Sequence, residues 1–151
     1  MSEYIFKRHN KSLLLYHLVC PIKYRRNVLS EEVEISLVEV CKNISERYEI
    51  HFIEIGADEN HVHFLKQSVP KVSVAIIVKT VKSITAKEIF RLHPEVKSKM
   101  RGGNFWRSGY YINTVGQYGN ENVIQKYIQN QGKQKTVYKS FNKNQLRLTL
   151  E

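Results

Sequence analysis

Two long stretches with helical spacing, separated by two stretches with strand spacing, constrain the fold of this chain more than any other feature. Apolar residues recur every three or four positions after Ser30 and again after Ser73, which predicts two amphipathic helices. Between them, residues 49–57 alternate as a strand does, and residues 61–66 begin a second strand. Turn-forming residues separate the two strands, so we expect a hairpin flanked by helices.

The remaining patterns add two more strands and a third helix. Residues 12–20 form an apolar run that predicts a buried strand, and residues 110–115 are rich enough in aromatic and β-branched side chains to predict another. Residues 121–131 favour a C-terminal helix. The order strand, helix, strand, strand, helix, strand, helix predicts an α+β fold with helices on one face of an antiparallel sheet, as in ferredoxin-like and RNA-recognition sandwiches.

Size and charge limit the number of domains and the kind of partner. The chain has 151 residues, enough for one typical domain, which we place at residues 1–131 and follow with a basic C-terminal tail at residues 132–151. Because 42% of the residues are hydrophobic, the chain can bury a core, and disorder as its main state is excluded. The net charge of +10 favours nucleic acid as a partner, although an anionic membrane surface would meet the same charge.

The cysteines and the N-terminal residues favour a location in the cytoplasm. Cys20 and Cys41 form neither a C-x-x-C pair nor a dense disulfide framework. The apolar run at residues 13–20 follows basic residues, as in a signal peptide, but His17 interrupts it and no small-residue cleavage site follows. The run is also too short to cross a bilayer, so we interpret it as a buried strand and expect no membrane segment.

The first candidate for chemistry is the pair His61 and His63, at the start of the second hairpin strand. Side chains two residues apart in a strand point to the same face. Two imidazoles at this spacing can grip one divalent cation and leave coordination positions open for an oxygen ligand and a phosphate. Polar strand residues that face solvent at the edge of the fold would show the same pattern, so these two histidines alone are compatible with a metal site and with a solvent-exposed strand end.

The second candidate lies in the predicted C-terminal helix. Tyr127 and Gln131 are four residues apart and therefore share one helical face. Gln131 can offer a carbonyl oxygen to a metal ion, and Tyr127 can offer a phenolic oxygen to a phosphorus atom held there. An amphipathic helix in which both side chains merely pack beside Ile124 and Ile128 is the alternative that spacing alone leaves open.

Four motifs in a fixed order resemble a known enzyme family. His61-Val62-His63 is similar to the HUH motif (His, hydrophobic, His) of the single-tyrosine transposases of bacterial insertion sequences, of the insertion-sequence-two-hundred type. The other similar segments are Tyr16-His17-Leu18-Val19 with the basic loop Lys23-Tyr24-Arg25-Arg26, the stretch W-R-S-G-Y-Y-I-N-T-V-G from Trp106 to Gly116, and Lys126-Tyr127-Ile128 with Gln131. The chain departs from the family pattern at Cys20-Pro21-Ile22-Lys23, Asn60 and Asn113, which concern DNA contacts and supporting hydrogen bonds rather than the ligands or the nucleophile.

The resemblance implies a metal-dependent DNA strand transferase. His61, His63 and Gln131 would hold Mg²⁺ or Mn²⁺, and Tyr127 on the C-terminal helix would attack a scissile phosphate in single-stranded DNA. The products would be a covalent 5′-phosphotyrosine and a free 3′-OH, and the covalent link would allow later rejoining without ATP. The resemblance also implies recognition of DNA hairpins, and a homodimer in which the Tyr127 helix of one subunit completes the histidine site of the other.

Basic and aromatic residues elsewhere in the chain are candidate contacts with single-stranded DNA. Tyr24, Trp106 and Tyr110 are candidate stacking platforms for unpaired bases. For any one residue of the set, a solvated surface role or plain packing is an equal alternative, and we interpret His17 and the other histidines outside the motif as structural or surface residues. The candidate phosphate contacts are Lys23, Arg25, Arg26, Lys79, Lys82, Lys97, Lys99, Arg101 and Arg107.

Two alternative functions share this charge and fold. A domesticated relative that acts on repetitive chromosomal palindromes would keep the chemistry and would often work as a monomer. A non-catalytic module of the RNA-recognition type would use the fold and the charge alone, but the chain lacks a good aromatic segment of the kind such modules use to stack bases.

Overall fold

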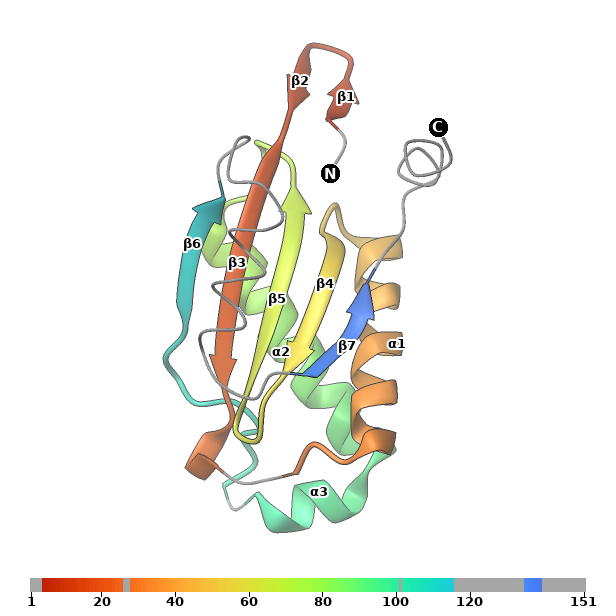
Figure 1. The fold of residues 1–151 in the computed structure, drawn as a ribbon, viewed down its shortest axis with the longest axis vertical. Coiled ribbons are helices and arrows are strands. Elements are labelled where there is room, and N and C mark those ends of the chain that lie inside the picture. Colours follow the sequence, from red (N-terminus) through yellow and green to blue (C-terminus); the bar gives the residue numbers. More distant parts are fainter. Residues whose placement is uncertain (1–3, 26–27, 101, 116–134, 140–151) are drawn as a thin grey trace.

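A five-stranded antiparallel sheet forms the centre of the protein (Figure 1). The computed structural model describes residues 4–25, 28–100, 102–115 and 135–139. Within them the strand order is β6-β3-β5-β4-β7, and every neighbouring pair is antiparallel. The strands are β3 (Leu14–Pro21), β4 (His51–Ala57), β5 (His61–Ser68), β6 (Tyr111–Val115) and β7 (Lys135–Lys139). The predicted hairpin is the pair β4 and β5, and the predicted α+β class is confirmed.

Two long helices, α1 (Glu31–Arg47) and α2 (Val74–Leu92), lie side by side on one face of the sheet (Figure 1). Ser30 caps α1 and Ser73 caps α2, and each hydroxyl accepts a hydrogen bond from the backbone N–H three residues later. Such a cap contributes ~1 kcal/mol, because it satisfies a donor that the helix itself cannot pair. Both helices therefore begin where the serines predict.

The hydrophobic core fills the space between the helices and the sheet. Large apolar side chains that are completely buried, such as Leu18 on β3 and Phe64 on β5, point to the helices. Burying each one stabilises the fold by roughly 1.5–3 kcal/mol, so the core fixes which face each strand residue takes. Alternate residues of β3 and β5 consequently lie on the opposite face of the sheet, which carries His17, His61 and His63 and is called the histidine face below.

Trp106 belongs to the core and not to the surface. Its side chain is 5% exposed, and its indole N–H donates a hydrogen bond to the Thr85 hydroxyl at 2.9 Å. Its ring meets the Phe105 ring edge-on, with centroids 4.6 Å apart. Trp106 contributes to the lining of the cleft described below, but the prediction that it stacks on DNA bases is wrong, because so little of the ring is exposed and its polar edge is used inside the protein.

Two features of the strands differ from the sequence prediction. A short hairpin of β1 (Ile5–Lys7) and β2 (Asn10–Ser12) precedes β3. Strand β4 contains an irregularity between Phe52 and Glu54, which shifts the register by one residue. Because of this shift Phe52 and Ile55 both reach the core, so the simple alternation predicted across residues 49–57 fails after Phe52.

In the C-terminal part of the chain the structure adds one strand to the prediction, and the predicted helix lies outside the described residues. Strand β7 falls inside residues 132–151, which the sequence predicts as a tail, and it extends the sheet along β4. Thr136, Val137 and Tyr138 are of the residue types that favour strands, so the run contains the signal for it. The helix predicted at residues 121–131 lies outside the described part of the chain.

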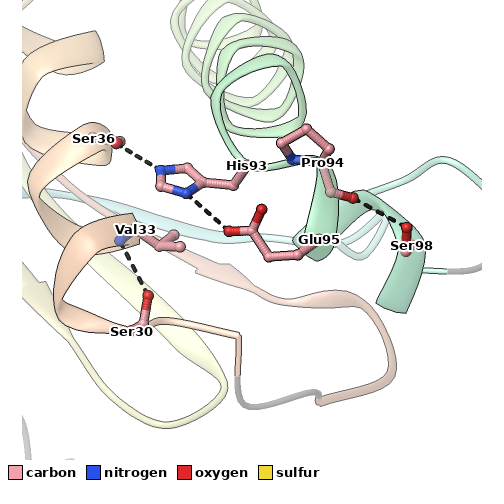
Figure 2. A network of polar contacts seen from close by, with 7 residues as sticks. All are labelled: Ser30, Val33, Ser36, His93, Pro94, Glu95 and Ser98. Atoms are coloured by element: carbon pink, nitrogen blue, oxygen red, sulfur yellow. Dashed lines mark hydrogen bonds and ion pairs between the residues drawn. The ribbon is translucent and has the colours of Figure 1, made fainter.

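A polar network ties α1 to the corner between α2 and the short helix α3 (Pro94–Lys99) (Figure 2). His93 Nε2 shares a hydrogen bond with the Ser36 hydroxyl at 2.7 Å, and His93 Nδ1 lies 3.1 Å from a carboxylate oxygen of Glu95. This order of atoms is that of a hydrolase triad, but Glu95 is 62% exposed and none of the three residues lines the cleft described below. We assign the network to helix packing.

Candidate active site and nucleic-acid cleft

His61 and His63 lie at the start of β5 and point to the histidine face, as the strand spacing predicts. Their ring centroids are 5.0 Å apart, which is short enough for one cation to be bound by a nitrogen of each ring at a metal–nitrogen distance of ~2.1 Å. The residue paired with His63 on the neighbouring strand β4 is Gly56, which presents no side chain on this face. The fold therefore brings the two imidazoles together, and β4 adds no side chain directly opposite His63.

His61 is held by the turn before β5. Its Nδ1 is hydrogen bonded to the side-chain oxygen of Asn60, and its Nε2 lies 3.7 Å from a carboxylate oxygen of Asp58. Because an amide oxygen only accepts hydrogen bonds, Nδ1 of His61 is the donor in this bond. Asn60 is one of the positions where the chain departs from the family pattern, and it supports His61 in the way expected of a residue behind a metal ligand.

His63 is almost completely buried. Its exposed fraction is 1%, its Nδ1 lies 3.3 Å from Nε2 of His17, and its own Nε2 is buried with no hydrogen-bond partner in the described part of the chain. Burial, and to a smaller extent the neighbouring His17 and His61, lower the pKa of His63 to about 3. This ring is therefore neutral at physiological pH, as a metal ligand must be.

The residues present fit a divalent cation, although only two of the three predicted ligands are described. The donor set that Mn²⁺ or Mg²⁺ would meet here is the buried Nε2 of His63, which has no hydrogen-bond partner among the described residues, together with a second imidazole whose ring centroid is 5.0 Å from that of His63. Among the described residues no group of three or more His, Cys, Asp or Glu side chains could hold a metal ion. Gln131 and Tyr127 lie outside those residues.

His17 also belongs to this site, although its position in the sequence predicts only a structural or surface role. Its side chain is 2% exposed and contacts His63 across the boundary between β3 and β5. Burial lowers the pKa of His17, and a side-chain hydrogen bond with Asn113 on β6 opposes this. The contact depends on the pairing of β3 with β5, and no short-range pattern in the sequence specifies that register.

A basic cleft of about 580 Å³ opens between α2 and the loop at residues 103–110. It brings together residues that lie far apart in the sequence, and among the predicted phosphate contacts it gathers Lys23, Lys79, Lys82 and Arg107. Tyr110 lines its edge and is 46% exposed, so this ring remains available to a nucleotide base. The cleft thus combines positive charge with an exposed aromatic ring.

The four cations of the cleft do not have the same surroundings. Lys79 and Arg107 are exposed, and Lys23 lies over the Tyr24 ring at 5.1 Å. The Lys82 ammonium donates hydrogen bonds to three consecutive carbonyl oxygens of the loop, from Arg107 to Gly109, at 2.6–3.4 Å. Lys82 therefore shapes the wall of the cleft, and a direct phosphate contact by Lys82 would have to compete with these bonds.

The other predicted contacts have mixed positions. Tyr24 is 57% exposed and adopts a left-handed backbone conformation with φ of 64°, which costs roughly 1–2 kcal/mol in a residue with a side chain. Lys97 and Lys99 are exposed on α3. Arg26 and Arg101 lie outside the described residues, as does the side chain of Arg25.

The cleft and the histidine pair lie at the same end of the sheet. The backbone N–H of Arg107 donates to the Pro21 carbonyl at 2.9 Å, and Pro21 is the partner of His61 in the pairing of β3 with β5. The backbone N–H of Ile22 donates to the Asn60 carbonyl at 2.7 Å, next to His61. These bonds fix the position of the cleft wall relative to the paired imidazoles.

Comparisons with known proteins agree on one family. The sequence model of a family described as "Transposase IS200 like" matches residues 10–131. The ISDra2 transposase TnpA of Deinococcus radiodurans is 35% identical over 118 residues, which cover 78% of this chain and 84% of that protein. The transposase for insertion sequence element IS200 of Salmonella typhimurium is 29% identical over 123 residues, or 82% of this chain and 80% of that protein.

Solved structures give the same result. The crystal structure of a protein of Deinococcus radiodurans R1, described as a transposase, superposes with a TM-score of 0.68 and 30% identity and covers 84% of this chain and 97% of its own. A tyrosine transposase associated with REP sequences, bound to a REP hairpin, has a TM-score of 0.53 at 10% identity over 84% of this chain and 68% of its own, which shows a shared fold. Among the described residues no helix has both the length and the apolar character to span a membrane.

Proposed function

The chain belongs to the IS200-like transposase family, and we propose that it cleaves and rejoins single-stranded DNA through a covalent 5′-phosphotyrosine on Tyr127. The observation that carries the proposal is the pair His61 and His63, whose rings are 5.0 Å apart on one face of the sheet. The Nε2 of His63 is buried with no hydrogen-bond partner in the part of the chain that the structure describes, and this supports the proposal further, because a buried polar atom left without a partner costs free energy.

The reaction follows from the groups that we assign to the site. The phenol of Tyr127 loses its proton and its oxygen attacks the scissile phosphorus, so that a bond from tyrosine to the 5′-phosphate forms. The bond to the 3′-oxygen breaks, and this oxygen takes a proton and leaves as a 3′-OH. His61, His63 and Gln131 would hold Mg²⁺ or Mn²⁺, which supplies polarisation of the phosphate and favours ionisation of a phenol whose usual pKa is ~10.

We assign the binding of DNA hairpins to the basic cleft and its surroundings. The net charge of +10 and the grouping of Lys23, Lys79 and Arg107 in one cleft support a contact with several phosphates. The exposed Tyr110 ring supports stacking on an unpaired base. The wall of the cleft is hydrogen bonded to the strand end beside His61, so the cleft and the proposed cleavage site belong to the same end of the sheet. The cleft opens beside α2 on the helix side and the two imidazoles lie on the opposite face, so DNA that reaches both would pass around this end of the sheet.

We further propose a homodimer in which Tyr127 of one subunit serves the histidine pair of the other. Mixed dimers test this arrangement: a Tyr127→Phe subunit and a His61→Ala subunit, each inactive with copies of itself, would together recover one working site. No recovery of cleavage from a verified mixed dimer would contradict an exchange between subunits and would leave each site within its own chain.

The main experiment asks whether the protein forms a covalent bond with DNA. Wild type, Tyr127→Phe and Tyr48→Phe are incubated with Mn²⁺ and single-stranded DNA that carries hairpins, and are then separated in SDS. We expect an SDS-resistant adduct with wild type and with Tyr48→Phe, the control that loses the phenol of an exposed tyrosine at the end of α1, outside the cleft. An adduct that persists in Tyr127→Phe would remove Tyr127 as the nucleophile.

A further inference from the structure

We propose that His17 is a positioning residue that holds His63 in the tautomer with its proton on Nδ1, so that the lone pair of Nε2 is presented to the cation. The inference rests on the proposed function insofar as it concerns the cation. Its structural part, the tautomer of His63 in the protein without metal, can be tested independently.

The two rings face each other inside the protein with their planes nearly parallel. His17 Nε2 and His63 Nδ1 are 3.3 Å apart, the ring planes differ by 14°, and the ring centroids are 5.3 Å apart. The nitrogens are thus about 2 Å closer than the centroids, so these two nitrogens are on the sides of the rings that face each other. Their separation is that of a hydrogen bond between one ring nitrogen that donates and one that accepts.

A hydrogen bond between two neutral imidazoles has two possible directions. In one direction His63 donates from Nδ1, His17 accepts at Nε2, and His63 keeps a lone pair on its own Nε2. In the other direction His17 donates, and His63 then carries its second N–H on Nε2. That N–H would be buried without an acceptor in the described part of the chain, at a cost of roughly 1–3 kcal/mol. The first direction is therefore favoured.

The surroundings of His17 support the same direction. If His17 accepts at Nε2, its own proton lies on Nδ1 and needs an acceptor. Asn113 stands opposite His17 in the pairing of β3 with β6, and its side chain raises the pKa of His17 against the effect of burial. The buried amide oxygen of Asn113 can accept that proton, and a chain of hydrogen bonds would then lead from Asn113 through His17 to His63.

The second histidine of the pair has the matching tautomer. His61 donates from Nδ1 to the Asn60 oxygen, so in the neutral ring that a metal ligand must have, the lone pair is on Nε2. Both rings of the pair would therefore offer Nε2 to the cation, each held at Nδ1 by a hydrogen bond. His61 is held from the adjoining turn, whereas His63 is held from the neighbouring strand β3 by a residue 46 positions away.

The test measures the tautomer of His63 and the affinity for Mn²⁺ in separate experiments. Long-range ¹H–¹⁵N spectra of histidine-labelled protein without metal report which nitrogen of His63 carries the proton, and calorimetry with Mn²⁺ alone reports affinity. The variants are His17→Leu, which removes the acceptor, and His17→Gln, which can replace it with an amide oxygen. His51→Leu serves as the control, because His51 is exposed on β4. Circular dichroism verifies that each variant is folded.

We expect His63 to be protonated on Nδ1 in wild type, in the His51→Leu control and in His17→Gln. In His17→Leu we expect a mixture of tautomers and Mn²⁺ affinity lower by roughly 10- to 100-fold. Unchanged tautomer and unchanged Mn²⁺ affinity in folded His17→Leu would overturn the inference, as would a wild-type His63 protonated on Nε2. Wild type that fails to bind Mn²⁺ while showing the expected tautomer would instead count against the proposed function.

Discussion

The replacement of Lys66 by methionine should stabilise the protein, because Lys66 is a charged residue type buried in the hydrophobic core. It lies on β5 on the side that faces the helices, it is 0% exposed, and its ammonium nitrogen has no hydrogen-bond partner in the described part of the chain. Burial lowers the pKa of Lys66 from 10.5 to about 7, and the nearby Cys20 and Cys41 oppose this only partly.

The size of the effect follows from these two pKa values. At pH 7 the unfolded chain binds the proton fully, whereas the folded protein binds it about half the time, and the difference costs about 4 kcal/mol at 1.36 kcal/mol per pKa unit. Because the unfolded state binds more protons between pH 7 and 10.5, stability rises with pH in that window. The expected rise from pH 7 to pH 9 is about 2 kcal/mol.

The window for the measurement ends near pH 9 because of two thiols in the same core. Burial raises the pKa of Cys20 to about 12 and raises that of Cys41 as well. Above pH 9 the unfolded chain therefore loses thiol protons that the folded protein keeps, and stability falls again. Between pH 7 and 9 the lysine dominates.

Urea unfolding followed by the fluorescence of the single buried tryptophan measures both effects. We expect Lys66→Met to be more stable than wild type by up to about 4 kcal/mol at pH 7 and to lose the rise between pH 7 and 9. Lys87→Met, an exposed lysine on α2, should change stability by less than about 0.5 kcal/mol. A wild type whose stability is flat over this range, or a destabilised Lys66→Met, would refute the reasoning.

Three further predictions use other parts of the structure. Trp106→Phe loses the hydrogen bond to Thr85 and should lower stability by about 1 kcal/mol in urea unfolding while leaving affinity for single-stranded DNA unchanged, since the ring is in the core. Ser36→Ala removes a hydrogen-bond partner of His93 and should lower the free energy of unfolding by about 1 kcal/mol. An unchanged urea midpoint would show that this hydrogen bond does not stabilise the packing of α1 against the corner between α2 and α3. Lys79→Ala should weaken DNA binding and reduce the slope of log affinity against log salt by about 1, and an unchanged slope in a filter-binding titration would remove Lys79 from the DNA contacts.

Much of the fold could be predicted because it depends on local patterns. The helical spacing and the serine caps predict α1 and α2, since both signals are contained within a few turns of helix. Alternation predicts β4 and β5 but not the irregularity after Phe52, because a bulge depends on pairing with the neighbouring strand. Strand β7 was not predicted because its run is rich in lysine, a residue type that is depleted in strands generally but tolerated in the last strand of a sheet.

In the candidate site, too, the features that depend on local spacing could be predicted, and those that depend on strand pairing could not. The spacing of His61 and His63 predicts their shared face, because two residues are one full period of a strand. The contact of His63 with His17 could not be predicted, since it depends on which strands pair and in which register. Trp106 was assigned to DNA contacts by residue type, but an aromatic residue serves a core equally well and only its surroundings decide.

The most direct test of the central claim is to identify the amino acid that becomes bonded to DNA. Protein incubated with Mn²⁺ and hairpin-bearing single-stranded DNA is digested with protease and nuclease, and the modified peptide is sequenced by mass spectrometry. We expect a nucleotide joined through its 5′-phosphate to Tyr127, with no such peptide from a His63→Ala variant. A 5′-phosphate carried by another tyrosine such as Tyr118, or a modified Tyr127 that persists without His63, would contradict the account.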